Sequence, residues 1–186
     1  MVTDLATRKL SYDDYLRLPD DGKRYELIAG ELYVTPAPGT RHQSTVANVL
    51  RLLGSFIYKR RMGRLWTAPL DVLFGPTDVV QPDLVFVSAE RREIITEAGV
   101  RGAPDLAIEV LSPSTRRRDE GIKLRQYERE GVLEYWLLDP DTRTAKVFGR
   151  EEDRLVLAAE LSAEAEDVLA SPLFPGLELD VAALFE

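Results

Sequence analysis

The sequence predicts a mixed α/β or α+β fold, built as one domain around a central sheet that helices flank. A long amphipathic segment precedes several short apolar runs, and a second helical segment separates two further runs. The 186 residues, 45% of them hydrophobic, are enough for one sizeable core. We find no internal repeat and no linker. We therefore expect a single domain over 1–186, with a core of roughly 10–148 and a C-terminal extension over 149–186.

The amino-terminal part predicts a short helix, a hairpin and a long helix. Ser11, with Asp14 three residues later, is typical of a helix N-cap. RYELI and ELYVT alternate in polarity around Ala29-Gly30, which predicts a hairpin. A helix is expected over 41–61, where an apolar stripe at helical spacing is typical of a face packed on the core rather than of a cofactor site: Val46, Val49, Leu50, Leu53 and Ile57.

The remainder predicts strands around one more helix. The apolar runs place strands near 64–67, 70–74, 82–87, 105–111 and 133–139. The helix between the last two begins after Ser114 or Thr115 and ends at Gly131, a residue typical of the position after a helix. Strand, helix and strand in this order predict a crossover unit. KVFGR and RLVLAAEL predict a final hairpin, followed by an exposed acidic segment over 162–167 and a short helix.

Composition excludes some functions and limits others. The net charge of −8 and the pI near 4.9 argue against general, non-specific nucleic-acid binding, although a local basic cleft stays open. Cysteine is absent, which excludes disulfides and thiolate metal sites. No apolar run suits a membrane span, and the N-terminus lacks the apolar core of a signal peptide, so we expect a cytoplasmic protein. The cations fall in three groups: Lys59, Arg60, Arg61 and Arg64; Arg91 and Arg92; Arg116, Arg117, Arg118, Arg125 and Arg129.

Two acids interrupt apolar runs that predict buried strands. Asp83 lies in VVQPDLVFV and Glu109 in DLAIEVLSPST. A buried carboxylate is costly unless a partner compensates it, and two on neighbouring strands can share a divalent cation. The alternatives are an ordinary strand-entry residue for Asp83 and a structural ion pair with an arginine for Glu109. Hard oxygen ligands favour Mg²⁺ or Mn²⁺, with the carbonyl of Val110 as a third metal ligand.

Other residues complete a candidate phosphodiesterase site. Lys123, in the second helix, could orient or deprotonate water or stabilise phosphate, although a helical lysine is more often simply solvated. Gln126 and Tyr127 share its helical face and could contact phosphate or support the lysine, or could merely pack. Glu26, in RYELI, could complete the metal site or be an exposed strand residue.

Candidate substrate contacts lie at two predicted helix starts. His42, the sole histidine, is expected by default at the surface of a helix terminus, and its alternative is the rim of a phosphate-binding cleft. Arg116, Arg117 and Arg118 begin the second helix, and phosphate contact competes there with an ordinary solvated charge run; Arg116 and Arg117 are the candidate site residues. Trp66 and Trp136 are expected in the core.

The ordered motifs resemble a known family. The pattern PD…E…K is similar to the PD-(D/E)XK nuclease superfamily. The longer series YELIAGELYV, RHQSTVANVL, QPDLVFV and LAIEVLSPSTRRRDEGIKLRQYEREGVLEYWLLDP resembles its bacterial Uma-type branch of restriction-endonuclease-like proteins, over roughly residues 10–148. The resemblance implies an αβββαβ core, Asp83 and Glu109 as metal ligands and Glu26 as an accessory acid. The superfamily lysine usually lies two residues after the second acid, where this chain has Leu111, so the resemblance implies that Lys123 replaces it.

These observations lead to one main functional hypothesis and two alternatives. The main one is a Mg²⁺- or Mn²⁺-dependent endonuclease that hydrolyses DNA phosphodiester bonds, with a homodimer expected from the need to cut two strands. The first alternative is a catalytically inactive nuclease-fold module that binds DNA or protein. The second alternative is hydrolysis of another phosphate ester or of a nucleotide, for which the sequence gives less support. The chain has no Gly-rich phosphate-binding motif of the kind that would favour an ATPase.

Overall fold

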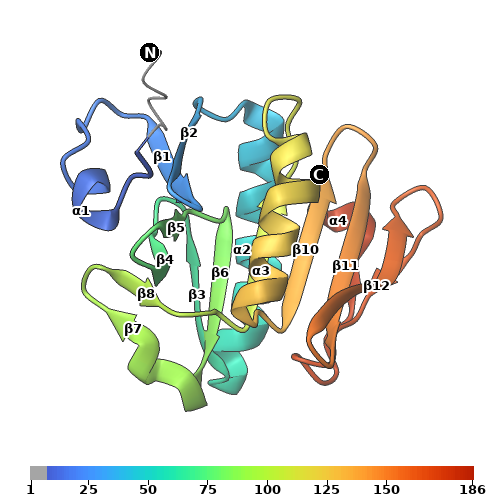
Figure 1. Ribbon diagram of the computed structural model, residues 1–186. Coiled ribbons are helices and arrows are strands. Elements are labelled where there is room, and N and C mark those ends of the chain that lie inside the picture. The colour runs from blue at the N-terminus through green and yellow to red at the C-terminus, as the bar shows by residue number, and fades with distance from the viewer. Residues whose placement is uncertain (1–7) are drawn as a thin grey trace.

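The computed structural model describes residues 8–186, so the first seven residues of the expected 1–186 domain lie outside the description (Figure 1). The first elements match the predicted order: α1 (Tyr12–Tyr15), β1 (Arg24–Ile28), β2 (Glu31–Thr35) and α2 (Thr40–Arg60). The Ser11 and Asp14 side chains each bond the backbone N–H of the other, which forms the predicted capping box.

The strands form two six-stranded sheets and one small ribbon. One sheet has the order β2-β1-β5-β4-β8-β7, with β4 (Val72–Gly75), β5 (Asp78–Val80), β7 (Ile95–Thr96) and β8 (Gly99–Arg101). The central sheet has the order β12-β11-β10-β9-β6-β3, with β3 (Gly63–Thr67), β6 (Leu84–Ser88), β9 (Leu106–Val110), β10 (Glu134–Asp139), β11 (Thr144–Glu151) and β12 (Arg154–Ser162). The ribbon pairs β13 (Val168–Leu169) with β14 (Leu179–Asp180). The chain ends after α4 (Val181–Leu184), and the 3₁₀ segment η1 (Ala89–Ile94) follows β6.

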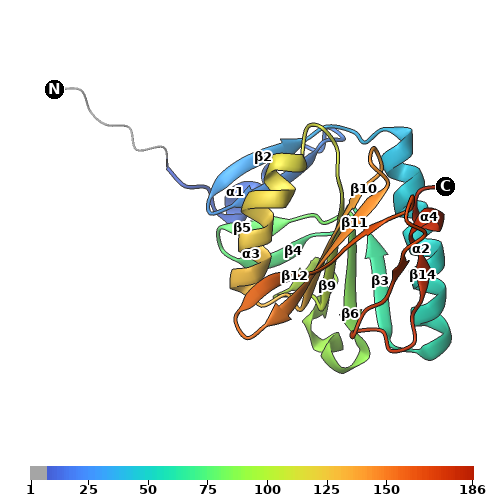
Figure 2. The ribbon, with the colours of Figure 1, turned by 90° about the vertical axis from the view of Figure 1, so that its right-hand side faces the viewer.

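The central sheet is buried on both faces because its strands alternate between two cores. In β9, Leu106 and Ile108 join the core beneath α2, whereas Ala107 faces the core beneath α3 (Leu124–Glu130) and the first sheet. Figure 2 shows α2 and α3 on opposite sides of this sheet. Since strands alternate their side chains, Glu109 lies on the α3 face, the face that carries the site.

The predicted crossover unit is present, with a local irregularity in its helix. Strands β9 and β10 pair in parallel, and the connecting helix begins with the π-helical turn η2 (Arg118–Lys123) before α3 continues. Gly131 ends α3 in the left-handed conformation, as predicted. A π turn widens the helix and often occurs at functional sites. Here it carries the inward side chains of Asp119 and Lys123.

The main departures from prediction are short strands and the C-terminal segment. The runs Asp78–Val80, Ile95–Thr96 and Gly99–Arg101 are too short for a periodic pattern to reveal. The C-terminal segment, expected as an extension outside a core of roughly 10–148, supplies part of the hydrophobic core beside α2: Leu169, Phe174, Leu177, Leu179, Val181 and Leu184. Trp136 is fully buried and Trp66 partly so. Within residues 8–186, we find no helix with the length and apolar character to span a membrane.

Candidate active site

Asp83 and Glu109 lie side by side because β6 and β9 are antiparallel neighbours. The ladder ends with the pair Leu84 and Ile108, and Asp83 and Glu109 come next along the two chain segments. The backbone N–H of Val110 donates to Asp83 Oδ2 at 2.9 Å, which ties the two chain segments together. Both acids are therefore brought to one end of the α3 face, as the spacing of the motifs requires.

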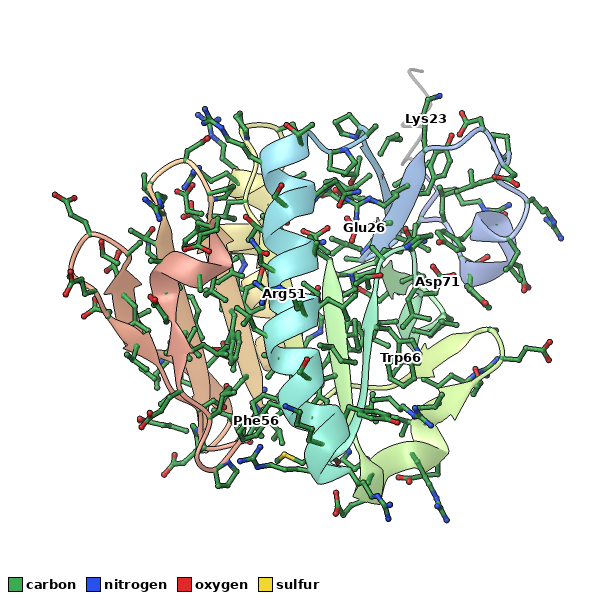
Figure 3. The ribbon with its side chains drawn as sticks, turned by 180° about the vertical axis from the view of Figure 1, so that it is seen from behind. Lys23, Glu26, Arg51, Phe56, Trp66 and Asp71 are labelled. Atoms are coloured by element: carbon green, nitrogen blue, oxygen red, sulfur yellow. The ribbon has the colours of Figure 1, made fainter. Side chains whose placement is uncertain are left out.

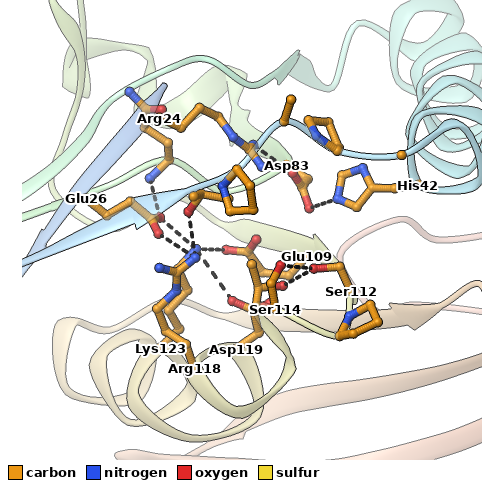
Figure 4. A pocket seen from close by; sticks show the side chains of 18 residues that line it. Arg24, Glu26, His42, Asp83, Glu109, Ser112, Ser114, Arg118, Asp119 and Lys123 are labelled. Carbon is orange, nitrogen blue, oxygen red and sulfur yellow. Dashed lines mark hydrogen bonds and ion pairs between the residues drawn. The ribbon is translucent and has the colours of Figure 1, made fainter. Parts of the chain in front are cut away.

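Asp83 is held by two cationic or polar side chains from the first sheet and from α2. Arg24 Nη1 donates to Asp83 Oδ1 at 2.9 Å, and His42 Nε2 lies 2.9 Å from Asp83 Oδ2. Figure 4 shows Asp83 next to His42 in the pocket. Burial by itself raises the pKa of Asp83, but the hydrogen bond and charge of His42 and the charge of Arg24 outweigh it and hold the pKa below its ordinary value. Asp83 is therefore an anion at neutral pH.

Lys123 lies between three carboxylates. Its Nζ is 2.7 Å from Glu109 Oε1, 2.7 Å from Glu26 Oε1 and 3.8 Å from Asp119 Oδ1. Burial opposes its charge, but these carboxylates outweigh that effect and raise the pKa of Lys123 above its ordinary value. This raised pKa makes Lys123 an ammonium ion that donates hydrogen bonds in this arrangement.

Glu109 differs from Asp83 in its electrostatics. Burial raises the pKa of Glu109 well above its ordinary value; the charge of Lys123 opposes this and the charge of Asp119 adds to it. Tyr127, which is fully buried, donates its O–H to Glu109 Oε1 at 3.0 Å, the same oxygen that Lys123 contacts. Tyr127 therefore bonds the acid that pairs with Lys123, and its contact with phosphate stays a prediction.

Glu26 is anchored from the first sheet. Its Oε1 accepts from the backbone N–H of Gln81 at 2.9 Å, and Arg118 Nη2 lies 3.4 Å from its Oε2. The Gln81 side chain is fixed in turn by Asp71, at 2.8 Å. Glu26 is only 2% exposed. Its expected alternative as an exposed strand residue is therefore wrong, because the first sheet folds this face of β1 onto the site.

These groups surround a pocket of about 230 Å³. Its lining includes four carboxylates and three fixed cations together with His42 and the loop before α2: Glu26, Asp83, Glu109, Asp119, Arg24, Arg118, Lys123, and Pro36, Ala37, Pro38 and Gly39. Figure 4 shows the charged side chains of the pocket and His42 pointing toward one another. The pocket is polar and narrow, and its charges are nearly balanced.

His42 corrects the default expectation of a surface position. It is 8% exposed, and its Nδ1 is buried without a hydrogen-bond partner in the described structure. Gly39 precedes α2 and supplies no side-chain cap, so the first amides of this helix are not satisfied by a cap. His42 is buried because the Pro36–Pro38 segment leads α2 directly onto Asp83, a tertiary contact that no local pattern encodes.

The other predicted substrate contacts lie outside the pocket. Gln126 Nε2 donates to Asp78 Oδ1 at 2.8 Å, and Arg116 Nη2 to Asp139 Oδ2 at 2.7 Å. Arg117 is exposed. Their contact with a substrate stays a prediction, as does the role of the Val110 carbonyl as a metal ligand.

Three pocket residues were missed as site residues by sequence reasoning. Arg24 stands two positions before Glu26 on β1, so strand alternation already places both on one face. Asp119 stands four positions before Lys123, which is the spacing of helical neighbours. Arg118, which donates to Thr35 at 2.7 Å, shared the prediction of phosphate contact with Arg116 and Arg117 but was not named as a site residue. The signal was present for the first two, but nothing local distinguished Arg118 from Arg117.

The donor set suits a hard divalent cation, although no site is preassembled. Among residues 8–186, no three His, Cys, Asp or Glu side chains are grouped so that they could hold a metal ion. Two buried carboxylate oxygens of the pocket, Glu26 Oε2 and Asp119 Oδ1, have no hydrogen-bond partner. Mg²⁺ is commonly held by one or two carboxylates together with waters and substrate phosphate oxygens. The pair Asp83 and Glu109 fits that mode.

Comparison with known proteins places the chain in a family. A family model described as "Putative restriction endonuclease", the Uma2 family, matches residues 12–182. The chain therefore belongs to this restriction-endonuclease-like family, and the resemblance recognised in the sequence is confirmed. Comparison with curated proteins gave no match.

A solved structure confirms the fold. A "putative nuclease belonging to DUF820" from Anabaena variabilis is 23% identical, and the match covers 95% of this chain and 97% of that chain with a TM-score of 0.79. The type IIG restriction endonuclease BpuSI matches with a TM-score of 0.40 at 15% identity, over 77% of this chain and 15% of that chain. The first likeness confirms the predicted restriction-endonuclease-like α/β fold.

Proposed function

We propose that the protein is a Mg²⁺- or Mn²⁺-dependent endonuclease that hydrolyses DNA phosphodiester bonds. One observation carries the proposal. Asp83 immediately precedes β6 and lies beside Glu109 of the neighbouring antiparallel strand β9, in a pocket where Lys123 Nζ lies 2.7 Å from Glu109 Oε1. Membership of a family described as "Putative restriction endonuclease" supports the reaction class.

Asp83 and Glu109 would hold the cation, with Glu26 as an accessory acid. A bound divalent cation would lower the pKa of a water molecule and neutralise charge on the phosphate. Asp83 suits this role because it is anionic at neutral pH, and Glu109 because Lys123 and Tyr127 both bond its Oε1. Both contacts leave Glu109 Oε2 free to take another ligand.

Lys123 would orient water or phosphate through its N–H groups and its charge. Its raised pKa disfavours the role of general base, which narrows the three roles predicted for it to orientation and charge stabilisation. Glu26 keeps the ammonium group in place from the other side, at 2.7 Å. A proton from the attacking water would therefore pass to solvent or to a phosphate oxygen rather than to Lys123.

The amino end of α2 would receive a phosphate group. Gly39 and His42 line the pocket, the helix has no side-chain cap, and His42 Nδ1 has no partner. Backbone N–H groups at the start of a 21-residue helix favour an anion. Arg118, 12% exposed, adds a fixed positive charge beside them.

The test compares Asp83→Asn with the wild type in two assays. Asp83→Asn keeps the shape of the side chain and removes its charge, so we expect loss of Mn²⁺ binding by calorimetry and a loss of at least about 100-fold in metal-dependent cleavage of supercoiled DNA. Asp78→Asn, a half-buried carboxylate outside the pocket, serves as the matched control and is expected to retain both activities. Equal cleavage by Asp83→Asn and wild type would contradict the proposal.

A catalytically inactive nuclease-fold module that binds DNA or protein is the second candidate. The observation that favours it is the saturation of Asp83, whose two oxygens already accept from Arg24, His42 and the Val110 N–H. In that case the wild type would retain DNA without cleaving it in Mg²⁺ or Mn²⁺, and Asp83→Asn would bind DNA as the wild type does.

A further inference from the structure

The carboxyl end of α2 carries a second feature of nucleic-acid-binding character, far from the pocket. A groove of about 530 Å³ lies between the end of α2, β3 and η1. We call it the basic groove. Its charged and aromatic lining comprises Tyr58, Lys59, Arg61, Arg64 and Arg92.

The basic groove differs from the pocket in its charge balance. Its lining contains four cations and no carboxylate, whereas four carboxylates line the pocket. Its four cations are exposed and, within the described part of the chain, form no ion pair with an acid; the nearby Arg91 is instead bonded to Asp105 at 3.1 Å. Because the chain has a net charge of −8, this local excess of positive charge does not follow from the overall composition.

Three chain segments converge to make the groove. Arg61 ends α2 in the left-handed conformation, and Gly63 then pairs with Ser88 at the end of β6. A side chain at Gly63 would clash with the carbonyl oxygen of Val87, so glycine is required for this close approach. Figure 3 shows the lower end of α2 lying beside the segment that follows β6.

The helix dipole explains only part of this arrangement. Cations in the last turn stabilise a helix, which accounts for Lys59. It does not account for Arg64 on β3 or Arg92 on η1, which belong to other elements. Tyr58, 79% exposed, adds an aromatic ring of the kind that stacks on bases or sugars.

We propose that the basic groove binds the sugar–phosphate backbone of the same nucleic acid whose phosphate enters the pocket; this inference rests on the proposed function. The separation along α2 fits such a ligand. His42 and Lys59 are 17 positions apart on one helix, which corresponds to about 25 Å. At about 3.4 Å per base pair, the two ends are roughly 7 to 8 base pairs apart.

The experiment measures binding of a duplex of about 20 base pairs and one of about 6 base pairs by fluorescence anisotropy, with Ca²⁺ in place of Mg²⁺. The test variant combines Lys59→Gln, Arg64→Gln and Arg92→Gln. The control variant combines Arg17→Gln, Arg125→Gln and Arg154→Gln, which removes the same charge from three exposed positions elsewhere. Thermal melting of all three proteins checks that they are folded.

We expect the test variant to lose roughly tenfold or more in affinity for the long duplex, with a salt dependence smaller by about 2.5 in log–log slope. The control variant should bind like the wild type, and the test variant should lose less affinity for the short duplex, which cannot reach the pocket and the basic groove at once. Equal affinity of the test and control variants for the long duplex, or no duplex binding by the wild type, would overturn the inference. Binding of the protein to anionic lipid vesicles that depends on the cations of the basic groove, without binding to a duplex, would overturn it as well.

The same preparations separate this inference from the proposed function. Duplex binding that depends on the cations of the basic groove, without Mn²⁺-dependent cleavage, would support nucleic-acid binding by the groove and contradict the proposed nuclease activity. Cleavage that depends on Asp83, with duplex binding that does not depend on the cations of the basic groove, would support the nuclease activity. It would overturn the inference that the groove binds the nucleic acid.

Discussion

Two buried glutamates on neighbouring strands of the central sheet lie on opposite faces and have different hydrogen-bond partners. Glu109 on β9 faces α3 and contacts the ammonium of Lys123. Glu134 on β10 faces the other core, where Ser171 O–H and Trp136 Nε1–H donate to it, each at 2.8 Å. Burial raises the pKa of both.

The difference lies in the partners. Glu134 has only neutral donors and no place in the pocket lining, which is how a protein accommodates a structural acid. Glu109 has a charged partner shared with other acids and borders open space. Burial of a carboxylate is therefore not by itself a sign of function; a shared charge at a pocket is the more specific feature.

The largest expected effect comes from removing the shared charge. Lys123→Met leaves Glu26 and Glu109 without their common cation, so we expect a loss of about 3–5 kcal/mol in the free energy of unfolding. Urea denaturation at pH 7 measures it. A loss below that caused by Ser171→Ala would remove the distinction between the two glutamates.

A smaller effect is expected on the other face. Ser171→Ala removes one neutral donor to Glu134 and leaves the Trp136 hydrogen bond in place. We expect the free energy of unfolding to fall by about 1–2 kcal/mol. Urea denaturation at pH 7 measures this change in the free energy of unfolding. Duplex binding should stay unchanged because Ser171 is not part of the pocket lining.

The pH dependence of Glu134 has a defined sign. Its pKa is raised on folding, so its contribution to stability is fully present below the ordinary value near 4.5 and is lost as the pH rises through the higher folded value. Glu134→Gln removes this titration. The stability of the wild type relative to Glu134→Gln should therefore decline with rising pH, as measured by denaturation from pH 4 upward; a flat difference would show that its pKa is not raised.

The smallest effect is expected at Arg116. It pairs with Asp139 at 2.7 Å but is 35% exposed, so Arg116→Ala should cost less than about 1 kcal/mol in stability. Duplex affinity measured on the same variant tests the prediction that Arg116 contacts substrate. An unchanged affinity would leave Arg116 as a structural partner of Asp139 alone.

The local patterns predicted most of the fold correctly. The capping box at Ser11, the hairpin around Ala29-Gly30, the long helix and the crossover ending at Gly131 all follow from short-range rules. Strands of two or three residues did not, because such runs are too short to show a period.

The sequence by itself pointed to Asp83 and Glu109, since each interrupts an apolar run typical of a buried strand. It also determined the family, through motifs spread along the chain. Only the tertiary structure decided their neighbours: His42 against Asp83, Lys123 between Glu26 and Glu109, and the cations of three segments in one groove. The reason is physical, because periodicity encodes which face a residue occupies, whereas these contacts arise from how separate elements pack.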